Sequence, residues 1–152
     1  MRIDKAARIG ICTIAMAAFA HCAWAEPDTH PIDAALSRCM ETDEGMSTAG
    51  MLDCLDTATA AWDAELNRIW GELMKVVDAD TKANLRASQR QWIAFRDAEI
   101  KALDSAYGSM QGSMFVPMHA DAVATLTRDR VRQLDGLLDV YRIDAPEDGG
   151  SE

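Results

Sequence analysis

The chain has 152 residues, of which 49% are hydrophobic, and this length and composition suit one small domain. Its formal net charge is −10, which argues against nucleic acid or an anionic membrane as a partner, because both bind basic surfaces. Without a leader of 25 residues the chain keeps 12 basic and 24 acidic side chains, a net charge of −12 that favours steering toward a basic partner.

The first 25 residues have the pattern of a signal peptide. The basic segment MRIDKAAR precedes the apolar run IGICTIAMAAFA, and Ala23-Trp24-Ala25 fits a cleavage site after Ala25. The apolar run is too short to span a bilayer, so we expect no membrane insertion after cleavage. The sequence therefore predicts a periplasmic or secreted protein.

Helices are expected along the rest of the chain. We expect residues 26–32 to be flexible, and Asp33 can cap a short helix, AALSRCME, before a turn. The next helix is predicted over residues 48–77, capped by Ser47 or Thr48. Its apolar side chains recur at spacings of three and four, as in an amphipathic helix: Met51, Leu55, Ala58, Trp62, Leu66, Ile69, Leu73 and Val76.

Two further helices follow. DADTK ends the second helix, and Thr81 is expected to open the third. YGSMQGSMF is a predicted loop, and Pro117 suits the first turn of a last helix that runs to about Arg142. Residues 144–152 are expected to form a disordered acidic tail.

No segment shows the alternation of a strand. The predicted architecture is therefore all-α, over residues 33–143: a small antiparallel bundle of three main helices plus a short N-terminal helix linked by one disulfide. The disulfide follows from cysteine use, because Cys39 and Cys54 remain as an even pair after Cys12 and Cys22 leave with the leader. Their spacing matches no zinc motif. In the chain-entropy model a loop of this size contributes about 3 kcal/mol.

Polar side chains lie on the core-facing side of two main helices. Gln89 and Arg96 fall within the apolar face of the third helix, and Thr127 and Arg130 within that of the last. A buried guanidinium needs hydrogen-bonding partners.

The candidate partners for these arginines are Glu65 and Glu99. Three interpretations stay open at this point: a satisfied polar layer that fixes helix register, an arginine-lined groove that receives an anion, or side chains that reach out to solvent.

Three motifs occur in a fixed order along the chain: WDAELNRIW, then SQRQWIAFRDAEI, then a Gly/Ser loop and LTRDRVRQL. With them the chain, over about residues 39–142, resembles the lysozyme-inhibitor LprI N-terminal-like family of bacterial envelope proteins. Cysteines common in that family are replaced by Ile100 and Ala122, which predicts a less cross-linked bundle. The matching signature residues are Leu66, Asn67, Gln89, Trp92, Arg96, Asp97, Glu99, Thr127, Arg130 and Leu134.

The resemblance implies an inhibitor of lysozyme and not an enzyme. Common animal lysozymes are basic and carry two catalytic carboxylates in a cleft, so an acidic protein would associate with them quickly. An exposed loop could fill that cleft, although the same segment could be an ordinary helix connection. The candidate inhibitory loop consists of Tyr107, Gly108, Ser109, Met110, Gly112 and Ser113.

The sequence also has features of other function classes. A periplasmic interaction module with a different partner is the main alternative. Met110, Met114, Met118 and His119 could suit Cu(I), but methionines at helical spacing are more often core residues. No catalytic or phosphate-binding motif is present, so we expect neither enzymatic activity nor a cofactor.

Overall fold

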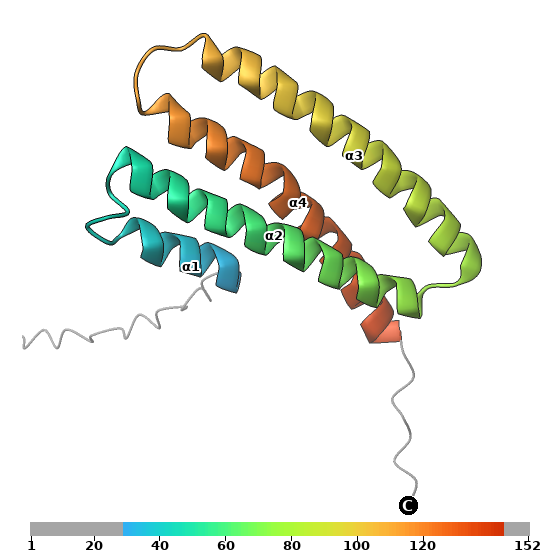
Figure 1. The fold of residues 1–152 in the computed structure, drawn as a ribbon. Helices are drawn as coiled ribbons and strands as arrows, with labels where there is room; N and C mark the ends of the chain where they lie inside the picture. The colour runs from blue at the N-terminus through green and yellow to red at the C-terminus, as the bar shows by residue number, and fades with distance from the viewer. Residues whose placement is uncertain (1–28, 145–152) are drawn as a thin grey trace, which may run out of the picture.

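The computed structural model describes residues 29–144, which form four helices and no strand (Figure 1). They are α1 (Pro31–Met40), α2 (Thr48–Val76), α3 (Ala79–Gly108) and α4 (Phe115–Asp144). α2 and α4 run in the same direction, and α3 returns antiparallel to both (Figure 1). This confirms the predicted all-α bundle of three main helices and one short helix. The predicted signal peptide, its cleavage site and residues 145–152 of the predicted tail lie outside the described residues.

Two helix starts differ from the prediction because other residues cap them. α1 begins at Pro31 and not after Asp33, because His30 Nδ1 accepts a hydrogen bond from the amide of Ile32 at 3.3 Å. The His30 ring also stacks on Trp62 of α2, with 4.4 Å between ring centroids. The cap therefore ties the start of α1 to the core.

α3 begins at Ala79 and not at Thr81. Asp78 is its N-cap, since the carboxylate accepts the amide of Thr81 at 2.9 Å and the Thr81 hydroxyl at 2.7 Å. The backbone hydrogen bond from Thr81 lowers the pKa of Asp78. For α2 the predicted Ser47 cap is confirmed: its Oγ accepts the amide of Gly50 at 3.0 Å.

The connection between α1 and α2 is closed by a disulfide and by two glycines. Cys39 and Cys54 are bonded, with 5.8 Å between their Cα atoms, which confirms the predicted pair. A Cβ on Gly45 would lie 2.0 Å from the carbonyl oxygen of Cys39, and a Cβ on Gly50 would lie 1.8 Å from that of Glu44. Both positions therefore need glycine for the turn to approach so closely.

The core lies between α2 and α4. Trp62, Ile69 and Leu73 of α2 are almost fully buried against Val131 and Leu138 of α4. The predicted apolar face of α2 is thus largely correct, except that Val76 is exposed and the next residue, Val77, is buried in its place.

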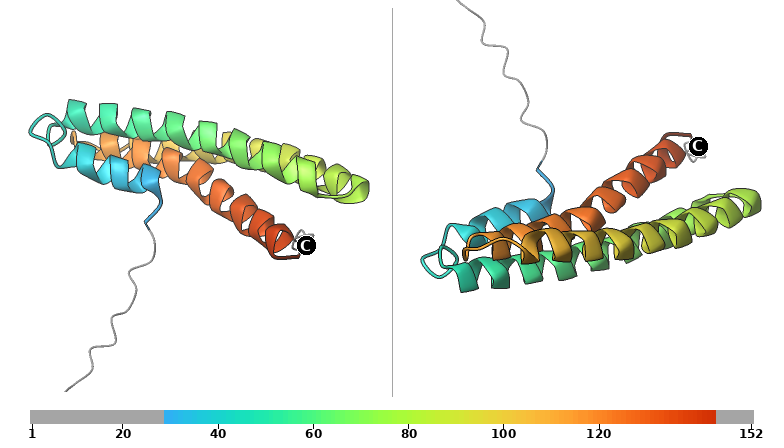
Figure 2. Two further views of the ribbon diagram at one scale, coloured as in Figure 1. Left: turned by 90° about the horizontal axis from the view of Figure 1, so that it is seen from below. Right: turned by 90° about the horizontal axis from the view of Figure 1, so that it is seen from above.

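α3 is held less firmly than the other long helices. None of its residues is fully buried, although Leu85 and Trp92 pack against the α2–α4 core. Figure 2 shows α4 diverging from the line of α2 and α3 toward its C-terminus. No helix within residues 29–144 is both long and apolar enough to cross a membrane.

Candidate interaction site at the loop end of the bundle

The two connections that join α1 to α2 and α3 to α4 lie at the same end of the molecule (Figure 1). We call this part, residues 38–56 and 101–124, the loop end. It contains seven acidic and two basic residues, a net charge of −5, whereas the other described residues contain twelve acidic and ten basic residues, a net charge of −2. Negative charge is therefore concentrated at one end of the bundle.

Ion pairs neutralise acidic residues mainly outside the loop end. Asp33 pairs with Arg132 at 2.7 Å and joins α1 to α4, and Glu72 pairs with Arg142 at 2.7 Å and joins α2 to α4. Within residues 29–144, Asp104 is the one loop-end carboxylate with such a partner, its Oδ1 lying 2.9 Å from Nε2 of His119. The remaining loop-end carboxylates are therefore free to interact with a partner.

The loop end also exposes large apolar side chains. Met114 is 62% exposed and Met118 is 45% exposed, while Met46 on the α1–α2 connection is 60% exposed. Apolar side chains gathered on an exposed surface are a common mark of an interaction site. Methionine is well suited to one because its flexible thioether adapts to different partners.

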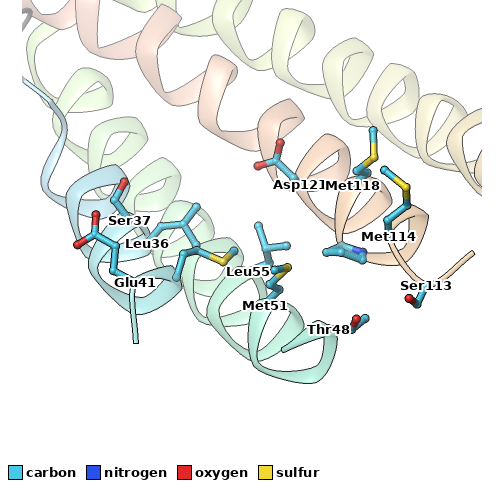
Figure 3. Close-up of a pocket in the computed structure, with 12 residues that line it drawn as sticks. Leu36, Ser37, Glu41, Thr48, Met51, Leu55, Ser113, Met114, Met118 and Asp121 are labelled. Atoms are coloured by element: carbon cyan, nitrogen blue, oxygen red, sulfur yellow. The ribbon is translucent and has the colours of Figure 1, made fainter. Parts of the chain in front are cut away.

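A groove crosses the loop end between the α1–α2 hairpin and the start of α4 (Figure 3). Its volume is about 750 Å³, within the usual range of ligand pockets. Leu55 of α2 is buried at its base, and Glu41 and Asp121 are exposed at its edges. Four methionines contribute to its walls, and we therefore call it the methionine groove: Met40, Met51, Met114 and Met118.

A second, smaller hollow of about 320 Å³ lies beside the α3–α4 connection. Tyr107, Gly108, Met110 and Gly112 of the candidate inhibitory loop line it together with His119, whose ring meets that of Tyr107 edge-on at 5.6 Å. Gly112 has a φ of 119°, a conformation that favours glycine.

The candidate loop is shorter than predicted and is divided between the two hollows. Tyr107 and Gly108 end α3, and Ser109 caps it, so the connection itself spans residues 109–114. Ser113 faces the methionine groove and not the smaller hollow. The four residues considered for Cu(I) are likewise separated: Met114 and Met118 line the groove, whereas Met110 and His119 line the other hollow.

The family-signature residues meet away from the loop end, around Trp92. Arg130 is only 9% exposed, and its guanidinium donates to Gln89 Oε1 at 2.9 Å and to Ser88 Oγ at 3.3 Å. It also lies over the Trp92 ring, 5.8 Å from the centroid. Burial lowers the pKa of Arg130. This arrangement agrees with a polar layer that joins α3 to α4.

Arg96 matches the interpretation of a side chain that reaches out toward solvent, and not that of a buried polar layer. Its side chain is 30% exposed and pairs with the neighbouring Asp97 at 2.9 Å, while its guanidinium lies 5.3 Å from the centroid of the Trp92 ring. The carbons nearest the backbone lie on the apolar face of α3, but the long side chain runs along the surface and carries the guanidinium to solvent.

The predicted acidic partners of the arginines are wrong. Glu65 pairs with Arg68 one turn along α2, and its Oε1 lies 3.8 Å from Nε2 of His30. These contacts, led by the hydrogen bond from Arg68, lower the pKa of Glu65. Within residues 29–144, Arg130 makes no ion pair with Glu65 or Glu99, and its hydrogen-bond acceptors are neutral.

The other signature residues have structural places. Leu66 and Leu134 are buried in the core, as is Thr127. Asn67 is exposed and donates to the carbonyl oxygen of Asp63 at 2.9 Å, and Glu99 is half-buried. The signature therefore consists chiefly of residues that pack the helices together.

Comparisons with known proteins agree with the motifs. Residues 39–134 match the sequence pattern of the family described as "Lysozyme inhibitor LprI". A crystal structure of an uncharacterized protein from Burkholderia thailandensis is 32% identical, with a TM-score of 0.71, over 76% of this chain and 57% of that one. This chain thus spans somewhat more than half the length of that protein. A comparison with curated proteins gave no match.

The chain belongs to the LprI lysozyme inhibitor family. That family is named for inhibitors of lysozyme. Together with the disulfide, it indicates a protein that acts outside the cytoplasm.

Proposed function

We propose that this protein is exported to the bacterial envelope, where it binds and inhibits a basic lysozyme with its loop end. The concentration of seven acidic residues against two basic ones at that end carries the proposal. Because most of these carboxylates have no cation beside them within the described chain, their field is available to attract a positively charged enzyme.

Inhibition requires the protein to block the substrate cleft. The connection over residues 109–114 turns at Gly112, which has a positive φ, and its residues Ser109, Met110 and Ser113 are exposed. In the proposed complex this connection enters the cleft, where its hydroxyl and amide groups occupy the place of the glycan. The acidic turn between α1 and α2 faces the basic surface around the cleft.

Kinetic measurements with the purified mature protein test this function. We expect binding to a basic lysozyme and loss of muramidase activity, with an association rate that falls as salt is raised, because exposed charges are screened beyond about 8–10 Å near physiological ionic strength. Replacing Ser109, Met110 and Ser113 by alanine should speed dissociation without changing the melting temperature. If the protein at micromolar concentration neither binds nor inhibits any lysozyme class, the result would favour an envelope interaction module with a different partner.

A further inference from the structure

The methionine groove combines an apolar interior with acidic edges. Met114 and Met118 are exposed on the α4 side, Met51 lies on the α2 side, and Figure 3 shows Glu41 and Asp121 on opposite sides of the opening. Neither carboxylate has an ion-pair partner within residues 29–144. An occupant that satisfies the whole groove must therefore be apolar at its centre and cationic at its flanks.

We propose that this groove is a docking site for a segment of a cationic protein in which an apolar side chain is flanked by lysine or arginine. The apolar side chain enters between Met51, Met114 and Met118, and its cationic neighbours meet Glu41 and Asp121. This rests on the proposed function in taking the partner to be cationic, and it assigns the recognition of that partner to the groove in addition to the loop over residues 109–114.

Physical chemistry favours this occupant over its alternatives. A second copy of this chain is also strongly acidic, and repulsion at the loop end opposes its docking there. A purely apolar ligand would leave the acidic edges without partners, and a purely cationic one would leave the methionines in water. Exposed methionines also adapt their shape to an incoming side chain at little cost in rotamer energy.

Binding of short peptides tests the apolar interior of the groove and its acidic edges separately. The probes are a twelve-residue peptide with a central leucine pair flanked by lysines, the same peptide with serines in place of the leucines, and the same peptide with glutamates in place of the lysines. We expect only the first to bind the mature protein in a calorimetric titration. Met114→Ser with Met118→Ser should weaken it by about tenfold, as expected when an apolar contact at the centre of a site is lost.

Matched variants distinguish the groove from other features. Met114→Leu with Met118→Leu keeps the groove apolar and should change the affinity by less than about twofold, whereas it would abolish a thioether metal site. Met46→Ser removes an equally exposed methionine outside the groove and should have no effect. Glu41→Gln with Asp121→Asn should weaken the lysine-flanked peptide, and Asp63→Asn, which lies away from the groove, should not.

The outcomes also separate this inference from the proposed function. Binding of the leucine–lysine peptide without any binding of lysozyme would retain the groove and reject the lysozyme partner. Inhibition of lysozyme that is unchanged by Met114→Ser with Met118→Ser, together with no peptide binding, would retain the proposed function and overturn the groove. Equal binding of the leucine and serine peptides would also overturn it, because the contact would then be purely electrostatic.

Discussion

At the scale of single residues, Arg130 is the costly feature of this fold. Its guanidinium is buried but hydrogen-bonds to neutral groups on α3 and α4, so no carboxylate offsets the loss of hydration. What the side chain supplies instead is a set of hydrogen bonds across the α3–α4 contact and a cation over the face of Trp92. α3, which has no fully buried residue, is held partly by this one side chain.

Because no carboxylate offsets the desolvation of this guanidinium, the charge of Arg130 should contribute less net stability than the volume of its side chain. We expect Arg130→Ala to lower the free energy of unfolding by about 2 kcal/mol. Arg130→Met, which keeps the contact with Trp92 without burying a charge, should cost less than about 1 kcal/mol. Urea unfolding of the two variants measures both values. Arg96→Ala is the control and should cost less than about 1 kcal/mol, because its pair with Asp97 is exposed. If methionine proves as damaging as alanine, the hydrogen bonds and charge are what hold α3.

At the scale of elements, α1 is a short helix that depends on its attachments. It contains no fully buried residue, and a helix of 10 residues is marginal by itself in water. It is kept in place by the disulfide, by the stacking of His30 on Trp62, and by the ion pairs of Asp33 with α4. One wall of the methionine groove depends on these attachments.

Removal of the disulfide tests this dependence. We expect Cys39→Ala with Cys54→Ala to lower the free energy of unfolding by about 3 kcal/mol, since the closed loop no longer restricts the unfolded chain. Helix content from circular dichroism should fall only slightly, because the α2–α4 core is retained. Reductant should destabilise the unmodified protein to the same extent and leave the double variant unchanged. A thiol assay that finds two reactive cysteines in native mature protein would contradict the bond itself.

At the scale of the whole molecule, net negative charge is concentrated at the loop end of the described residues. Apart from the pair of His119 with Asp104, the ion pairs that link the helices lie outside the loop end. The turn between α1 and α2 carries Glu41, Asp43 and Glu44, none of which has a cation beside it within residues 29–144. Like charges held close together oppose the compact state. Their retention in a small domain is therefore easier to understand as serving a partner than as serving stability.

Neutralising the turn should separate these two effects. For Asp43→Asn with Glu44→Gln we expect a melting temperature that is unchanged or slightly higher, because repulsion is relieved. The association rate with a basic lysozyme at low salt should fall severalfold, and its dependence on salt concentration should become weaker. Stopped-flow binding and thermal unfolding provide the two measurements. Asp63→Asn changes the net charge by one unit away from the loop end and controls for a general charge effect. A clear loss of stability would show that the turn carboxylates are structural.

The helices and the disulfide of this protein follow from its sequence, because both depend on local information. Apolar spacing of three and four residues identifies α2, and its predicted face, from Leu55 to Leu73, is the face that packs against α4. An even pair of cysteines in a chain with a predicted leader is enough to expect the bond between Cys39 and Cys54. The motifs that indicate the family are also local, since each occupies one helix or one loop.

The partners of polar side chains and the shape of the candidate site were decided by the tertiary structure. Helical phase places Arg96 and Arg130 alike on apolar faces, but only the second is buried, because α3 contacts the bundle through few residues and leaves its long side chains room to reach solvent. The methionine groove is formed by residues from α1, α2 and α4 that lie up to 85 positions apart, from Leu36 to Asp121. No spacing rule within one helix connects them, so only the packing of the chain brings Met40 and Met51 to the same groove as Met114 and Met118.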